Sequence, residues 1–401
     1  MNRLRRSLCT VATVRLPVLL PVLLPVLLSV LLSVLLGACA ANEPRIPPSE
    51  LKPITQDVSV GPVWSRNLDD SGRGRFEPLV TEASVTVADE DGVVVRYERQ
   101  SGDVLWRVAL KRQLVSAVGG NDELVFVAGR DGWVLALDAE SGDESWRTQV
   151  SSDVLAPVAL AFDTAVVRSA DGRVVRLNLA DGTERWSSSW TPPALTINGY
   201  GRPLVVDGGV LVGLDDGRVV ALNSANGRVL WEAVLSRPAG RSEVERMVDV
   251  DADIAVDTDG IYAVNFQGRA VRLEPSRGGV DWAVEMSSTS GLTVGDAKVV
   301  IVDDEGHVHA LDKSSGSTLW TQEALRGRKP SAPALVGGSV VVGDFEGYLH
   351  VLDANTGLIK GRREIAHGAI RVQPQGDQRG LVVQSIEGEV RVVRLSSSGS
   401  S

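Results

Sequence analysis

A period of about 40 residues is the feature that most limits what this chain can fold into. A turn glycine that follows Asp, Glu or Gln recurs at Gly92, Gly132, Gly172, Gly217, Gly268, Gly306, Gly347 and Gly388. The intervals between them are 40, 40, 45, 51, 38, 41 and 41 residues. A repeat of this length holds about four short strands, the size of one propeller blade. The period therefore predicts an all-β repeat protein.

Short apolar strands follow these turns, for example at residues 133–138, 218–223 and 348–353. Asp-Gly between two apolar runs favours a tight hairpin, because such a turn needs positive φ. Many of these strands carry apolar residues on both faces, as expected when each sheet is sandwiched between neighbouring sheets. Eight turns thus predict eight blades.

A tryptophan four residues after a second glycine completes most repeats. It recurs at Trp106, Trp146, Trp186, Trp231, Trp282 and Trp320. The seventh repeat has Gly361 at this position, and the eighth ends before reaching it, whereas Trp64 precedes the first repeat without a partner. We therefore expect residues 57–395 to form an eight-bladed β-propeller of four-stranded blades, in which the N-terminal strand carrying Trp64 closes the ring and removes exposed edges.

These tryptophans could pack between blades or stack on a ligand or cofactor. Their single repeating position favours packing between adjacent blades. Trp133 and Trp190 lie outside this position and are freer to be exposed.

The first 38 residues have the features of a secretory signal. Arg3, Arg5, Arg6 and Arg15 precede an apolar run at 16–36, and small residues follow. The run is also long enough for an uncleaved membrane anchor, although its three prolines suit a removable segment better. The Leu-Gly-Ala-Cys sequence that ends at Cys39 resembles a bacterial lipobox, which implies a lipidated (palmitate-bearing) Cys39.

The segments flanking the repeats are expected to lack a fold of their own. The four prolines within residues 39–56 predict an extended tether, and residues 396–401 are expected to be a disordered tail. In the lipoprotein resemblance, Ala40 rather than Asp after the cysteine favours the outer membrane of a Gram-negative cell.

The charge and cysteine content argue against two classes of function, nucleic-acid binding and cysteine-based metal or disulfide chemistry. The formal net charge is −10, and no Asp or Glu precedes residue 40, so the repeats are more acidic than the whole chain. An acidic surface repels phosphate backbones, which argues against nucleic-acid binding. Cys9 and Cys39, the two cysteines of the chain, both precede the repeats and leave none for a disulfide or a cysteine-based metal site there.

Motifs for catalysis are missing from the sequence. It contains no HExxH, P-loop, GxGxxG or GxSxG segment. His307 and His309 share a strand face and could hold a metal, but no carboxylate–histidine motif accompanies them. Within the acidic run from Asp249 to Asp259, the segment Asp257-x-Asp259-Gly260 is similar to part of a calcium loop but lacks its first Asp and its closing Glu. We expect no catalytic residue, metal or cofactor.

Two repeats are lengthened at equivalent places, each between a Trp strand and the next blade. The insertions are residues 187–202 and 235–256. Connections of one type leave the same face of a propeller, so these neighbouring loops should lie side by side. The first carries apolar Leu195 and Ile197, and the second places Glu243, Glu245, Asp249 and Asp251 around Arg246. An apolar centre with charged surroundings is typical of a protein interface; alternatively, both loops fold back over the rim.

The repeat A-L-[DN]-x-x-[ST]-G-x-x-x-W is similar to that of PQQ-type propellers. Together with the lipobox, it resembles the BamB family of propeller lipoproteins over residues 57–395, most specifically in 194–199, 242–251 and 341–350. The resemblance implies a non-catalytic scaffold of the outer-membrane β-barrel assembly machinery that binds the periplasmic POTRA domains of BamA.

The same resemblance implies partner contacts at Leu195, Ile197, Asp249 and Asp251. The family's Arg after the second apolar residue is Asn198 here, and Arg202 is close enough to compensate. Two alternatives stay open: a PQQ-dependent dehydrogenase, which shares the repeat but is longer and often carries a vicinal cysteine pair, and a scaffold for another envelope partner.

Overall fold

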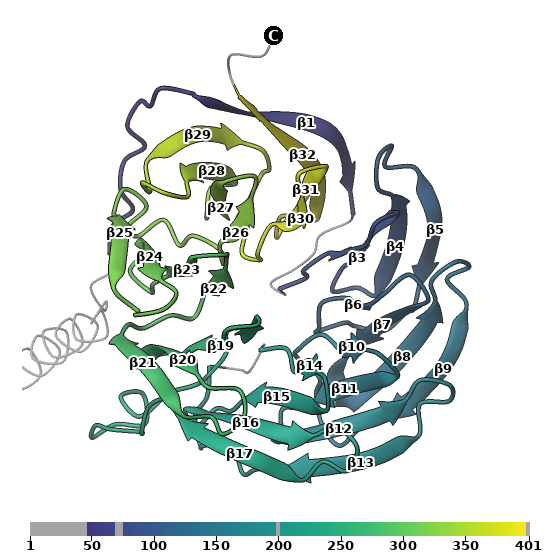
Figure 1. The fold of residues 1–401 in the computed structure, drawn as a ribbon. Helices are drawn as coiled ribbons and strands as arrows, with labels where there is room; N and C mark the ends of the chain where they lie inside the picture. The colour runs from purple at the N-terminus through teal and green to yellow at the C-terminus, as the bar shows by residue number, and fades with distance from the viewer. Residues whose placement is uncertain (1–45, 69–74, 198–200, 398–401) are drawn as a thin grey trace, which may run out of the picture. The chain divides into compact units, whose positions relative to one another are not determined.

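The fold was analysed in a computed structural model that describes residues 46–68, 75–197 and 201–397. Residues 47–401 form one compact unit. Its described part contains eight four-stranded antiparallel sheets, arranged as the blades of a ring (Figure 1). The predicted eight-bladed propeller is therefore confirmed. The signal at 1–38 and Cys39 lie outside the described residues, and the described part of the chain has no helix that is long and apolar enough to cross a membrane.

The first four blades run in chain order from the inner to the outer strand. Their strands are β2 (Leu79–Val80), β3 (Ser84–Ala88), β4 (Val93–Glu98), β5 (Val104–Ala109); β6 (Gly119–Gly120), β7 (Leu124–Ala128), β8 (Trp133–Asp138), β9 (Glu144–Gln149); β10 (Ala159–Ala161), β11 (Thr164–Arg168), β12 (Arg173–Asn178), β13 (Glu184–Ser189); β14 (Leu204–Val206), β15 (Gly209–Gly213), β16 (Arg218–Asn223) and β17 (Val229–Val234). A 3-10 turn, η1 (Arg130–Gly132), precedes β8.

The other four blades follow the same pattern until the ring closes. Their strands are β18 (Ala255–Val256), β19 (Ile261–Val264), β20 (Arg269–Leu273), β21 (Val280–Glu285); β22 (Gly291–Val294), β23 (Lys298–Val302), β24 (Val308–Asp312), β25 (Thr318–Gln322); β26 (Ala334–Val336), β27 (Ser339–Gly343), β28 (Tyr348–Asp353), β29 (Ile359–Glu364); β30 (Gln375–Asp377), β31 (Gly380–Gln384), β32 (Glu389–Ser397) and β1 (Val58–Asn67).

The N-terminal strand closes the ring. β1 is the outer strand of the eighth sheet and pairs with β32 from Val58–Ser397 to Asn67–Glu389, with a bulge between Pro62 and Trp64. An outer strand tolerates a proline, because one of its edges makes no ladder hydrogen bonds. The inner strand β2 of the first blade lies beside β30 of the last. Both termini of the repeat region are thereby held in one blade.

The repeated tryptophans join each blade to the next. The ring of Trp186, for example, lies against Gly227 of the following blade, and its Nε1–H donates to the carbonyl of Ser224 at 2.8 Å. The same bond recurs from Trp64, Trp106, Trp146, Trp231, Trp282 and Trp320 to the carbonyls of Arg99, Ala139, Leu179, Pro275, Lys313 and Ala354. In the seven blades built by chain order, the outer strand has a register shift directly before this position, which is a tryptophan in six of them and Gly361 in the seventh.

Gly361, the residue at the tryptophan position of the seventh blade, lies where β1 passes. A Cβ at Gly361 would lie 2.4 Å from the carbonyl oxygen of Val58, so the close approach of this strand excludes a side chain. The amide of Asp57 also donates to the carbonyl of Lys360 at 2.8 Å. Ring closure thus explains why the motif changes here.

The segment before β1 has no regular secondary structure but is attached to the propeller. The amide of Ser49 donates to the carbonyl of Arg326 at 2.9 Å, and Arg362 donates to the carbonyl of Lys52 at 2.8 Å. Residues 49–57 therefore follow the outside of the sixth and seventh blades (Figure 1). At the other end, β32 includes Ser396 and Ser397, the first residues of the expected tail.

Candidate functional site

The two long loops meet on one face of the ring. The amide of Ile197 in the first loop donates to Oδ1 of Asp249 in the second at 2.9 Å. Five residues further on, the amide of Arg202 donates to Oδ1 of Asp253 at 2.7 Å. The loops therefore lie side by side, as their equivalent positions in the repeat predict.

The tips of both loops present apolar side chains. Leu195 is 41% exposed, Ile197 is half-buried, and Val244 of the second loop is 52% exposed. Exposed Arg246 lies beside Glu243 at 3.5 Å, and Glu245 accepts the amide of Arg241 at 2.6 Å. The tip of the second loop is therefore held together by its own charged side chains, which flank Val244 in the sequence. Asn198 lies outside the described residues.

Asp249 and Asp251 are not part of this exposed surface. Asp249 is fully buried and Asp251 is 5% exposed, although the sequence-based interpretation had both facing a partner. Together with Asp215 of the β15–β16 turn, their carboxylates offer oxygens that all lie within 4.8 Å of one another. Within the described residues, Oδ2 of Asp249 and both carboxylate oxygens of Asp251 have no hydrogen-bond partner. These side chains lie beneath the loops rather than at their tips.

This arrangement perturbs both carboxyl groups. Burial, opposed by the bond from the Ile197 amide, raises the pKa of Asp249 to about 6. Burial and the neighbouring charge of Asp249 raise the pKa of Asp251 to about 7. Arg168, buried in the third blade, pairs with Asp215. Its positive charge lowers the pKa of Asp249 and of Asp251, but this effect is smaller than the increase that burial causes.

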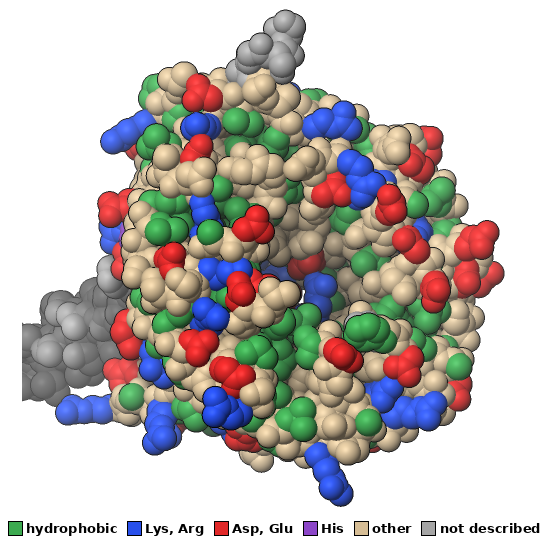
Figure 2. Space-filling view, viewed as in Figure 1, with side chains coloured by type: hydrophobic (Ala, Val, Ile, Leu, Met, Phe, Trp, Pro, Cys, Tyr) green, Lys and Arg blue, Asp and Glu red, His purple; other side chains and the backbone are tan. Residues whose placement is uncertain are grey.

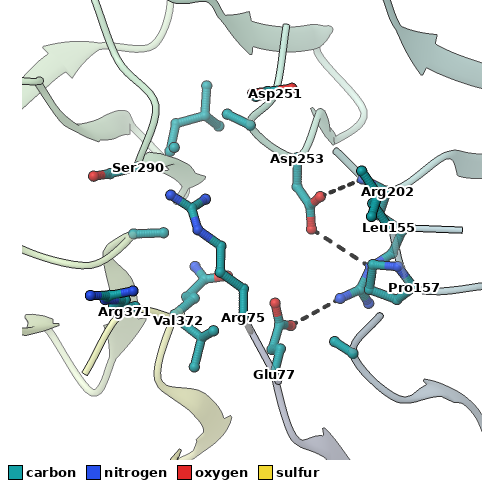
Figure 3. A pocket seen from close by; sticks show the side chains of 16 residues that line it. Arg75, Glu77, Leu155, Pro157, Arg202, Asp251, Asp253, Ser290, Arg371 and Val372 are labelled. Atoms are coloured by element: carbon teal, nitrogen blue, oxygen red, sulfur yellow. Dashed lines mark hydrogen bonds and ion pairs between the residues drawn. The ribbon is translucent and has the colours of Figure 1, made fainter. Parts of the chain in front are cut away.

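The floor of the site continues into a small central pocket lined by residues from several blades. Arg202 pairs with Oε1 of Glu77 at 3.0 Å and lies 3.6 Å from Oδ2 of Asp253 (Figure 3). Arg75, on the same segment as Glu77, extends into the pocket, and Arg371 lines it on the side opposite Arg202 (Figure 3). In the surface view, acidic and basic side chains gather around the central hollow (Figure 2).

Arg202 is therefore engaged inside the ring. Its side chain bridges the entry to the first blade and the second loop, rather than replacing at the loop tip the arginine of the family pattern.

Other residues singled out in the sequence have local partners. Lys313 lies between Asp257 and Asp259, at 2.8 and 2.7 Å, where a calcium ion would need those oxygens. Trp133 and Trp190 are half-buried, and the guanidinium of Arg112 lies over the Trp133 ring at 5.7 Å.

Arg168, Asp215 and Glu77 were not predicted as site residues. Each comes from a different blade, and the repeat pattern by itself does not indicate which irregular residues the ring brings together. The Asp215-Asp216 pair directly before Gly217 is a local signal, because no other turn glycine of the pattern directly follows two aspartates.

Comparisons with known proteins agree with this architecture. The family model described as outer membrane protein assembly factor BamB matches residues 90–322. The chain is 45% identical over 302 residues to outer membrane protein assembly factor BamB of Pseudomonas aeruginosa, which covers 74% of this chain and 79% of the relative. The crystal structure of BamB from Moraxella catarrhalis superposes with a TM-score of 0.78 at 26% identity, covering 84% of this chain and all of that one.

A quinohemoprotein alcohol dehydrogenase from Comamonas testosteroni is similar in fold alone. Its TM-score is 0.69 at 14% identity, and the match covers 88% of this chain and 81% of the enzyme. The relatives at 40 to 45% identity, by contrast, share one name. On this evidence the chain belongs to the BamB family of outer membrane protein assembly factors.

Proposed function

We propose that this protein is a non-catalytic scaffold lipoprotein of the outer-membrane β-barrel assembly machinery. It binds the periplasmic POTRA domains of BamA and assists the folding and insertion of β-barrel proteins. Lipidated Cys39 anchors it to the periplasmic face of the outer membrane in a Gram-negative cell. The observation that carries the proposal is the two-loop surface of a BamB-family propeller, with an exposed apolar tip supported by buried carboxylates.

The interface has Leu195 at its centre with Ile197 two residues along the same loop, and exposed Val244 of the second loop extends it. Desolvating exposed apolar side chains of this size favours association, and central residues of an interface carry most of its binding energy. Exposed Arg246 belongs to the polar rim of this interface, and Asn198, outside the described residues, is proposed as a further partner contact. Asp249 contributes by supporting the first loop from beneath through the Ile197 amide. Burial keeps both Asp249 and Asp251 from a partner's surface unless the loops rearrange.

The central pocket supports a scaffold better than a PQQ-dependent dehydrogenase. Its cavity volume is about 70 Å³, whereas sites for small organic ligands typically enclose about 300–1,000 Å³. An ion-pair network lies across this pocket, because Arg202 pairs with Glu77 and lies beside Asp253. A planar cofactor would have to displace these ion pairs.

Site-specific crosslinking in living cells tests this function directly. A photoreactive amino acid is placed at Leu195 in one strain and, as the control, at Leu358, an equally apolar side chain that is 61% exposed between β28 and β29. The proposal predicts an adduct with BamA from position 195 and not from position 358. An adduct with another envelope protein would mean that this protein, and not BamA, is the partner. The absence of any adduct from position 195 would show that Leu195 is not part of the interface.

A further inference from the structure

Two histidines and an aspartate converge in the sixth blade. Asp303 follows β23, His307 ends the turn, and His309 lies on β24. Nδ1 of His307 and Nε2 of His309 both lie 2.9 Å from Oδ2 of Asp303. The three side chains are 16 to 18% exposed, so the cluster is partly open to solvent.

The geometry is held by the backbone of the turn and by the outer strand. The amide of His307 donates to Oδ1 of Asp303 at 2.8 Å, which fixes the carboxylate so that Oδ2 faces both rings. On the far side of its ring, Nδ1 of His309 lies 3.1 Å from the hydroxyl of Thr321 in β25. The hydroxyl oxygen of Thr321 can accept a hydrogen bond from Nδ1–H of His309, which leaves the lone pair of Nε2 free to bind a metal.

The next blade shows the same cluster in a closed form. Asp344 accepts the amide of Tyr348 at 3.0 Å and lies 2.8 Å from Nε2 of His350. Arg328 also lies 2.7 Å from Oδ2 of Asp344, so that cluster contains a fixed cation, and Asp344 and His350 are fully buried.

Both features differ at Asp303. The loop residue equivalent to Arg328 is Ser287, since both accept a hydrogen bond from the residue after the aspartate. The residue equivalent to Tyr348 is His307. The sixth blade therefore has no arginine beside its aspartate, because Ser287 stands at that position, and it has a second imidazole, His307, where the seventh blade has a tyrosine.

We propose that Asp303, His307 and His309 form a binding site for a divalent transition-metal ion, best served by Zn²⁺. Two imidazole nitrogens and one carboxylate oxygen make a borderline donor set, which suits zinc and its neighbours better than calcium or magnesium. The three ligand atoms lie within 4.8 Å of one another. A tetrahedral ion with ligands about 2.1 Å away needs them roughly 3.4 Å apart, so the two 2.9 Å contacts open by about half an ångström. Water completes the coordination.

The sequence alone did not carry this inference, because the histidine pair lacked a recognisable carboxylate. Asp303 lies four residues before His307 on the opposite arm of a hairpin, and the tight turn brings the two together. The neighbouring acids have other partners: Asp304 accepts the amide and hydroxyl of Thr289, and Glu305 pairs with Arg326. The site is therefore limited to three protein ligands.

Titration of Zn²⁺ into the full-length protein in detergent, carrying no histidine tag, tests the site by calorimetry. Co²⁺ serves as a second probe, because a tetrahedral site gives it an intense visible spectrum. We expect one ion per chain with a dissociation constant below about 10 µM. His309→Ala should weaken binding more than about a hundredfold, since even outer partners of ligands cost 10- to 100-fold. Thr321→Val, at an exposed position, should weaken it about tenfold.

His367→Ala is the matched control, because this histidine is exposed and distant in sequence from the cluster. It should leave both the stoichiometry and the Co²⁺ spectrum unchanged. Circular dichroism establishes that each variant is folded; if His309→Ala does not fold, Thr321→Val decides. Wild-type protein that binds no stoichiometric Zn²⁺, or binding that persists in folded His309→Ala or is unaffected by Thr321→Val, would overturn the proposal.

Discussion

The backbone amide of Ile197 donates to the buried carboxylate of Asp249 at 2.9 Å, and this bond joins the two long loops of the propeller. An acidic residue that looks in sequence like a partner contact is thereby an internal support. Leu195 and Val244, which lie in the two loops joined by this bond, remain exposed to solvent.

Substitutions at Asp249 separate support from direct contact. Asp249→Asn keeps a carbonyl oxygen that can accept the Ile197 amide and should retain partner affinity within about threefold. Asp249→Ala removes the acceptor and should weaken binding about 10- to 100-fold, the usual effect of losing a hydrogen bond to a charged group. Binding of BamA periplasmic domains measures both. If Asn weakens binding as much as Ala, the charge itself contacts the partner.

The raised pKa of Asp251 predicts a pH-dependent stability. Its value of about 7 in the fold exceeds that of an unfolded aspartate near 3.8, so the native state binds more protons between these values. The stability it contributes is therefore full below pH 4 and is lost as the pH rises through 7. Asp251→Asn should remove this loss and stabilise the protein at pH 8 by up to about 4 kcal/mol.

Urea unfolding at pH 5 and pH 8 measures this effect. Asp296→Asn, at an exposed position before β23, is the control and should leave the difference between the two pH values as in the wild type. An equal pH dependence in the wild type and Asp251→Asn would show that Asp251 is ionised without cost.

Packing between blades predicts that alanine substitutions at two glycines of the same backbone conformation lower the stability of the protein by different amounts. Gly227 and Gly208 have φ of 71° and 70°. A Cβ at Gly227 would lie 2.6 Å from Cε3 of Trp186, whereas nothing lies within 4 Å of a Cβ at Gly208. Both alanine variants bear the backbone strain of about 1–2 kcal/mol, but Gly227→Ala should lose about 1–3 kcal/mol more from overpacking. Equal losses in chemical unfolding would refute the tryptophan–glycine account.

Ring closure predicts that β1 is required for stability. A chain that starts at Leu68 lacks the outer strand of the eighth blade and the buried Trp64. It should unfold at a lower denaturant concentration than a chain that starts at Pro47. The free energy of unfolding should fall by more than about 3–5 kcal/mol, the loss typical of removing one buried tryptophan side chain. Similar unfolding midpoints for the two chains would mean that the ring holds without β1.

The repeat made the propeller predictable, because each turn glycine and each tryptophan serves the same local purpose in every blade. Ring closure followed from the same count, since Trp64 was left over at one end. The repeat could not explain why Gly361 replaces the tryptophan of the other blades. The glycine is needed because β1 passes close to it, and β1 lies about 300 positions away in the chain.

The site was predictable only in part. Loop lengths indicated that residues 187–202 and 235–256 meet, but not which side chains turn inward. Asp249 and Arg202 resemble surface residues in sequence, but Asp249 is buried beneath Ile197 and Arg202 pairs with Glu77 inside the ring, and both partners come from other segments. Such contacts are made by folding of the whole ring and leave no local signal.

The measurement that tests the central claim most directly is a binding titration with BamA periplasmic domains. The full-length protein in detergent is compared with Leu195→Asp and Leu358→Asp, two exposed leucines on different parts of the propeller. Leu195→Asp should weaken binding at least about 30-fold, as for a central interface residue that contributes about 2 kcal/mol, while Leu358→Asp binds like the wild type. Undiminished binding by folded Leu195→Asp would contradict the account.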